Sequence, residues 1–116
     1  MALFLLSFTV AVGAVQAPIS INLDAPLPDT LVKIAICESG DVDHPVGNAL
    51  AKNSTSTASG RFQFIHSTWI HYAKMLWGKD YINKDVFNWE DNTELAEYVY
   101  ANFGTADWDS SRHCWK

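Results

Sequence analysis

The sequence has 116 residues, a formal net charge of −5 and a pI near 5.1. Hydrophobic residues make up 48% of it and aromatic residues 13%, which excludes disordered, collagen-like and coiled-coil proteins. Nucleic acid is not an expected partner, because phosphate neutralisation needs clustered Lys and Arg. We expect one small, monomeric domain. A chain of this size buries only about 60–70% of its unfolded surface, so a cross-link would help it fold.

Residues 1–17 (MALFLLSFTVAVGAVQA) form an apolar segment, and no charged side chain precedes Asp24. The segment is shorter than the roughly 18–20 apolar residues that span a bilayer, and it ends in small residues that suit a signal-peptidase site. We interpret it as a secretory signal peptide, with cleavage after Ala17 or Ala14. The alternative is an uncleaved anchor, which would be the only attachment to a membrane. Either interpretation places the protein outside the cytosol, secreted or in the cell envelope.

Export determines how the two cysteines are interpreted. In an oxidising compartment we expect Cys37 and Cys114 to form a disulfide, worth about 4–5 kcal/mol by the chain-entropy model. The alternative is two buried thiols in a cytosolic protein. The sequence has no CxxC or HxxxH pair, so we predict neither a metal nor a cofactor. We interpret the four histidines as structural or exposed residues: His44, His66, His71 and His113.

The elements follow in chain order. Residues 18–28 hold three of the four prolines and predict a linker. A helix is expected from Asp29 to Gly40, with an apolar stripe at helical spacing. Residues 41–60 are polar and predict a long loop or a short irregular β-region, of a kind that is often functional. Residues 61–65 (RFQFI) alternate and predict a short strand or an extended entry to the next helix.

The second half of the chain is expected to be helical. Ser67 or Thr68 can cap a helix that ends at Gly78, and residues 79–89 form a connection. Residues 91–94 (DNTE) predict a capping box that opens a helix ending at Gly104, and residues 105–116 form a tail. The expected fold class is α+β, mainly α, in one domain over residues 29–116.

Glu38 is the most informative residue. It shares one helical face with Leu31, Ile34 and Ala35, so its carboxyl group continues an apolar stripe. It also lies in the last turn of the predicted helix, where the helix dipole is negative. Both conditions disfavour the ionised form and raise the pKa, which suits a general acid. The alternative is a helix-terminal glutamate that simply reaches water.

Two motifs resemble a known family. Residues 35–40 (AICESG) resemble the catalytic motif of the lysozyme-like lytic transglycosylases, above all that of the resuscitation-promoting factors. Residues 60–64 (GRFQF), followed by Ser67-Thr68-Trp69, resemble the Gly-x-x-Gln and Ser-Thr-Trp segment of the same superfamily. Residues 43–63 are also similar to lambda-type phage endolysins. The position of Cys114 matches the partner cysteine of those domains, and the resemblance covers residues 31–115.

The resemblance implies a small lysozyme-like domain with an active-site cleft. The implied substrate is peptidoglycan, cleaved between N-acetylmuramic acid and N-acetylglucosamine. Glu38 would protonate the bridging oxygen and then act as base on the muramoyl C6 hydroxyl, which gives a 1,6-anhydro product. The implied substrate-binding residues are Ser39, Phe62, Gln63, Tyr100 and Trp108. Tyr100 departs from the family pattern, because its motif has adjacent Tyr and Asn and here Ala101 separates them.

Alternatives remain at two points. Asp41 or Asp43 could act as a second carboxylate and support lysozyme-type hydrolysis, although a solvated loop is the simpler interpretation of both. A non-catalytic peptidoglycan-binding or signalling domain of the same fold is a further alternative. Among the aromatic residues, we expect Trp69 and Trp77 to belong to the core.

Overall fold

The computed structural model describes residues 26–116, so the expected signal segment and most of the expected linker lie outside the described residues. The described part is mainly helical, as expected. Its β-structure consists of two isolated antiparallel bridges, Lys52–Ser59 and Ser59–Phe64. The helices are α1 (Asp29–Ser39), α2 (His66–Trp77), η1 (Gly78–Asn83), α3 (Trp89–Phe103), η2 (Ala106–Ser111) and α4 (Arg112–Trp115), where η marks a 3-10 helix.

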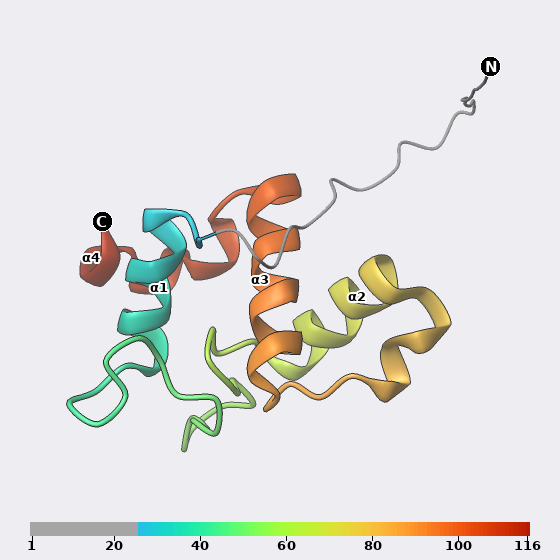
Figure 1. The fold of residues 1–116 in the computed structure, drawn as a ribbon, viewed down its shortest axis with the longest axis horizontal. Helices are drawn as coiled ribbons and strands as arrows, with labels where there is room; N and C mark the ends of the chain where they lie inside the picture. The colour runs from blue at the N-terminus through green and yellow to red at the C-terminus, as the bar shows by residue number, and fades with distance from the viewer. Residues whose placement is uncertain (1–25) are drawn as a thin grey trace.

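Helix α3 lies in the middle of the molecule, with α1 and α4 on one side and α2 on the other (Figure 1). The apolar stripes of α1 and α3 meet in one core, because residues three or four apart share a helical face. Aromatic side chains from residues 62–69 and from η2 complete it. The core includes Leu31, Ile34, Leu95, Val99, Phe62, Phe64, Trp69 and Trp108.

Helix α1 ends at Ser39, where the sequence predicts its end. The backbone of Gly40 is extended (φ −76°), and its N–H donates to the carbonyl of Ile36 at 2.9 Å. A Cβ at Gly40 would lie 2.7 Å from that carbonyl oxygen. Glycine is therefore needed for this close approach, and not for a left-handed cap.

The start of α2 differs from the prediction that Ser67 or Thr68 caps it. The helix begins at His66, and the N-cap residue Ile65 offers no side-chain hydrogen bond. The hydroxyl of Thr57, in the preceding loop, accepts from the backbone N–H of His66 at 2.9 Å. Thr57, nine residues earlier in the chain, thus accepts from a helix N-terminal N–H that a local N-cap side chain would otherwise satisfy.

The predicted start of α3 is also wrong. The helix begins at Trp89, and Asn88 is its N-cap, with a side chain that accepts from the Asp91 backbone N–H at 2.9 Å. The Asp91 carboxylate instead accepts from the backbone N–H of Asp85 at 3.0 Å. Asp91 therefore holds the preceding connection, and the helix begins three residues, nearly one turn, before the predicted start.

Residues 61–65 do not form a strand. Ser59 and Phe64 exchange two backbone hydrogen bonds across a tight turn, with distances of 3.0 and 3.1 Å. Gln63, inside this turn, has a left-handed backbone (φ 54°). The alternation of residues 61–65 reflects a turn with Phe62 and Phe64 in the core, and not a pleated strand.

Buried Asn92 joins this turn to α3 and to the connection before it. Its Oδ1 accepts from the Phe62 backbone N–H, and its Nδ2 donates to the Val86 carbonyl, both at 2.8 Å. Gly60 packs so closely here that a Cβ would lie 2.2 Å from the Val86 oxygen. One side chain therefore satisfies two backbone groups, the buried Phe62 N–H and the partly buried Val86 carbonyl.

The expected disulfide between Cys37 and Cys114 is present, with a Cα–Cα distance of 6.0 Å and a sequence separation of 77 residues. It fastens the last turn of α1 to α4 at the end of the chain. Among residues 26–116, no helix is both long and apolar enough to cross a bilayer.

Reduction of the disulfide is expected to lower the free energy of unfolding by about 4–5 kcal/mol, because a loop of this length is released in the unfolded chain. Denaturant titration with and without dithiothreitol measures the change. A variant with both Cys37→Ser and Cys114→Ser serves as the control, since its stability should be insensitive to dithiothreitol. An equal loss in that variant would contradict the explanation.

Substitution Asn92→Ala is expected to cost about 2–4 kcal/mol, because it leaves the buried Phe62 N–H and the partly buried Val86 carbonyl without their partner. Asn88→Ala is the matched control and removes only an exposed helix cap, worth about 1 kcal/mol. Urea unfolding of both variants gives the comparison. Equal losses would show that Asn92 is not a structural bridge.

Candidate functional site

A cleft of about 450 Å³ opens between the end of α1, the loop before α2, the start of α2, and η2. Of the catalytic and substrate-binding residues expected from the sequence, Glu38, Gln63 and Trp108 line this cleft. Four of the other nine lining residues are neutral and polar. The full lining is Cys37, Glu38, Asn53, Ser56, Ala58, Gln63, Phe64, Ile65, Thr68, Asp107, Trp108 and Ser110.

Glu38 is half-buried on one wall of the cleft. Loss of solvent around its carboxyl group raises the pKa of Glu38 above the ordinary value of 4.5, and a hydrogen bond from Ser111 opposes this only in part. The proton therefore stays on Glu38 to a higher pH than on a free glutamate. That is the property a general acid needs.

Ser111 can serve both protonation states of Glu38. Its hydroxyl lies 2.5 Å from Glu38 Oε2, to which it donates when the carboxyl group is ionised. The same hydroxyl lies 3.1 Å from the Trp108 carbonyl. When Glu38 is protonated, Ser111 can accept from it and donate to that carbonyl instead. The Glu38 carboxyl group would therefore keep Ser111 as a hydrogen-bond partner both before and after it loses a proton.

Gln63 presents an acceptor to the cleft. Its Nε2 donates to the carbonyls of Ala51 at 3.1 Å and Gly60 at 2.9 Å. Both amide hydrogens are thereby used, so the side-chain oxygen is the group left for a ligand. The left-handed backbone of Gln63 (φ 54°) is costly for a residue other than glycine, and such conformations gather at functional sites.

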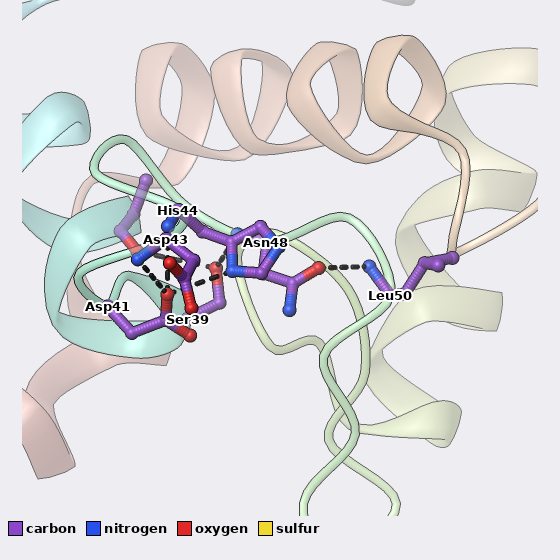
Figure 2. A network of polar contacts seen from close by, with 7 residues as sticks. Ser39, Asp41, Asp43, His44, Asn48 and Leu50 are labelled. Carbon is purple, nitrogen blue, oxygen red and sulfur yellow. Dashed lines mark hydrogen bonds and ion pairs between the residues drawn. The ribbon is translucent and has the colours of Figure 1, made fainter.

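Ser39 lies behind the cleft and belongs to the framework. Its hydroxyl donates to the Arg61 carbonyl at 2.7 Å and accepts from the Asn48 backbone N–H at 2.8 Å. Figure 2 shows this hydroxyl beneath the loop that follows α1. Ser39 is buried and does not line the cleft, so its position gives no support to the expected substrate contact.

Asp41 and Asp43 do not reach the cleft. Asp41 Oδ1 accepts from the backbone N–H groups of Asp43 and His44 and contacts His44 Nδ1 at 2.8 Å (Figure 2). The hydrogen bond from His44 is the main reason why the pKa of Asp41 is lowered. The pair closes an exposed turn. The carboxylate that does line the cleft beside Glu38 is Asp107.

Buried Arg61 holds the loop against α3. Its Nε donates to the Val46 carbonyl at 3.1 Å, and its Nη1 donates to Thr93 Oγ1 at 2.9 Å. The guanidinium also stacks 3.8 Å above the ring of Trp89, a cation–π contact. Burial lowers the pKa of Arg61 to about 10, so the group remains charged at neutral pH. This anchoring fixes one side of the cleft.

Two predicted substrate-binding residues lie away from the cleft. Phe62 is fully buried in the core, and Tyr100 on α3 is half-buried against that core. Neither lines the cleft, so the expected sugar contacts have no support from their positions. Trp69 is a core residue, as expected, and packs against Trp77 with a ring-centroid distance of 5.7 Å.

Sequence reasoning missed part of the site. Ser111 contacts Glu38, and five other polar residues line the cleft: Asn53, Ser56, Thr68, Asp107 and Ser110. One signal was available. A bond between Cys37 and Cys114 brings the residues before Cys114 close to Glu38, so polar side chains there were candidates for the same cleft.

No family model matches the chain, and no curated protein or solved structure is significantly similar to it. Within residues 26–116, no three His, Cys, Asp or Glu side chains come together as a metal site would require. The chemistry of the cleft is therefore inferred from its geometry and from the motifs.

Substitution Ser111→Ala is expected to raise the pKa of Glu38 further, because a hydrogen bond to the ionised form is lost. Carbon-13 NMR titration of the Glu38 carboxyl group measures the shift. Ser110→Ala is the matched control, since Ser110 lines the cleft while Ser111 holds the carboxyl group. A lower pKa in the Ser111 variant would contradict the assignment.

Proposed function

We propose that this protein is an exported, lysozyme-like enzyme that cleaves peptidoglycan, with Glu38 as its catalytic acid. The observation that carries the proposal is a half-buried carboxyl group with a raised pKa that lines a polar cleft of about 450 Å³. The resemblance of residues 35–40 and 60–69 to lytic transglycosylases supports the same reaction. The disulfide is compatible with a location outside the cytosol.

The reaction begins with the protonated form of Glu38. Its proton passes to the oxygen that links N-acetylmuramic acid to N-acetylglucosamine, and the C–O bond breaks as positive charge develops on the sugar ring. The carboxylate left behind accepts the proton of the muramoyl C6 hydroxyl, whose oxygen bonds to C1. Ser111 donates to the carboxylate in this second step. The product carries a 1,6-anhydro ring, and Glu38 regains its proton.

The lining of the cleft suits an N-acetylated polysaccharide. Neutral amides and hydroxyls are the groups that bind sugar hydroxyls, and Phe64 and Trp108 supply an apolar floor. The free oxygen of Gln63 can accept from an acetamido N–H. A strongly charged ligand such as a nucleotide phosphate would find no Lys or Arg among the lining residues.

Hydrolysis is the second candidate reaction, and one observation favours it. Asp107 lines the same cleft as Glu38, and a second carboxylate can activate water in a lysozyme-type mechanism. The products separate the two reactions. Mass spectrometry of released muropeptides should show anhydro ends, which are lighter by one water than the reducing ends of a hydrolase.

Substitution Glu38→Gln is expected to remove almost all muropeptide release, on the order of a thousandfold or more, because the only proton donor at the scissile bond is lost. Glu90→Gln, at an exposed position on α3, is the matched control and should digest walls at the wild-type rate. Undiminished digestion by the Glu38 variant would overturn the mechanism. Wild-type protein that binds walls and releases nothing would indicate a binding domain.

The loss of activity should not reflect unfolding. A raised pKa means that the proton on Glu38 stabilises the fold below the ordinary value of 4.5, and that this stabilisation is lost as pH rises through the pKa of the folded state. Glutamine keeps the neutral form at every pH. The Glu38→Gln variant should therefore melt at or above the wild-type Tm at neutral pH, as measured by circular dichroism.

A further inference from the structure

The short helix η2 supplies one wall of the cleft. Asp107, Trp108 and Ser110 line the space, and Ser111 at the end of the helix contacts Glu38. The helix is held at its other end as well, because the hydroxyl of Tyr72 on α2 donates to Asp107 Oδ2 at 3.0 Å. A ligand that contacts η2 is therefore placed at a set position relative to Glu38.

Tyr72 is itself well supported. Its ring packs against the ring of Phe103 with a centroid distance of 5.2 Å and against His71 at 5.0 Å. The Tyr72 hydrogen bond occupies one oxygen of Asp107 and orients the carboxylate. Among residues 26–116, no hydrogen bond to the other oxygen, Oδ1, is found. That oxygen is the acceptor that the wall can offer to a ligand.

We propose that Asp107 binds a sugar hydroxyl of the glycan strand and thereby places the scissile bond against Glu38, with Tyr72 as the residue that positions the carboxylate. This inference rests on the proposed function. A carboxylate is a stronger acceptor than the neutral amides and hydroxyls around it, so one contact of this kind can select the register of a repeating polymer. The disulfide holds the region of η2 next to α1, because Cys114 follows η2 and Cys37 precedes Glu38 on α1. A strand bound at η2 is therefore held at a set position relative to Glu38.

The test uses peptide-free glycan strands as substrate, so that only sugar groups are available to Asp107. Asp107→Asn should raise KM about tenfold, the loss of one charge-assisted hydrogen bond, lower kcat by only about threefold through looser placement of the scissile bond, and leave the product ends unchanged. Tyr72→Phe should raise KM less, because it loosens the carboxylate without removing it. Asp109→Asn is the matched control on the same helix: Asp109 pairs with Arg112 at 3.2 Å, and its loss should leave KM unchanged.

Binding in an inactive background separates this inference from the proposed function. The Kd of the same strands is measured by calorimetry for Glu38→Gln alone and together with Asp107→Asn. A weaker Kd in the double variant supports the contact. Equal Kd values in the two variants would overturn it. A collapse of kcat in Asp107→Asn would also overturn it and would assign Asp107 as a catalytic base. If neither variant binds glycan strands, both the proposed function and the proposed contact of Asp107 with a sugar hydroxyl are wrong.

Discussion

The bond between Cys37 and Cys114 is the constraint on which the rest of the molecule depends. It joins residues 77 positions apart, and one of them is the neighbour of Glu38. Without it, η2 and α4 would be held to the rest of the molecule only by non-covalent contacts, chiefly those of the core residues Trp108 and Trp115. With it, that segment becomes a wall of the cleft and gives Glu38 its hydrogen-bond partner, Ser111. The stability of the fold and the geometry of the site therefore rest on the same covalent bond.

The other wall is built differently, from buried polar side chains that hold a loop without regular secondary structure. Asn92 joins the backbone of the turn at residues 60–64 to that of the connection before α3, and Arg61 ties the loop to α3. Ser39 uses its hydroxyl to fasten the same region to α1. Such groups are costly to bury unless each has a partner, and here most of the partners are backbone atoms, with the Thr93 hydroxyl as the exception. These buried polar side chains therefore hold the loop that carries Gln63 in place.

The two walls give the carboxyl group of Glu38 a consistent environment. Burial raises its pKa, which favours the acid form, and Ser111 provides a hydrogen bond whichever form is present. The proposed mechanism, in which one carboxyl group acts first as acid and then as base, needs both conditions. Asp107 and Ser111 lie near opposite ends of η2, and Ser111 contacts Glu38. In the proposed mechanism, a substrate bound to Asp107 would therefore lie at a set distance from the Glu38 carboxyl group.

The sequence by itself determined the three main helices, the loop between the first two, the cysteine pair and the half-buried position of Glu38. The helices and the position of Glu38 follow from spacing along the chain, because an apolar stripe at helical spacing shows which face is buried. The loop follows from its polar composition, and the cysteine pair follows from the expected export to an oxidising compartment. Only the tertiary structure decided the start of α2, where Thr57 replaces a local cap, and the places of Phe62 in the core and of Asp107 and Ser111 beside Glu38. These depend on contacts between distant segments, for which neither helical period nor local propensity carries information.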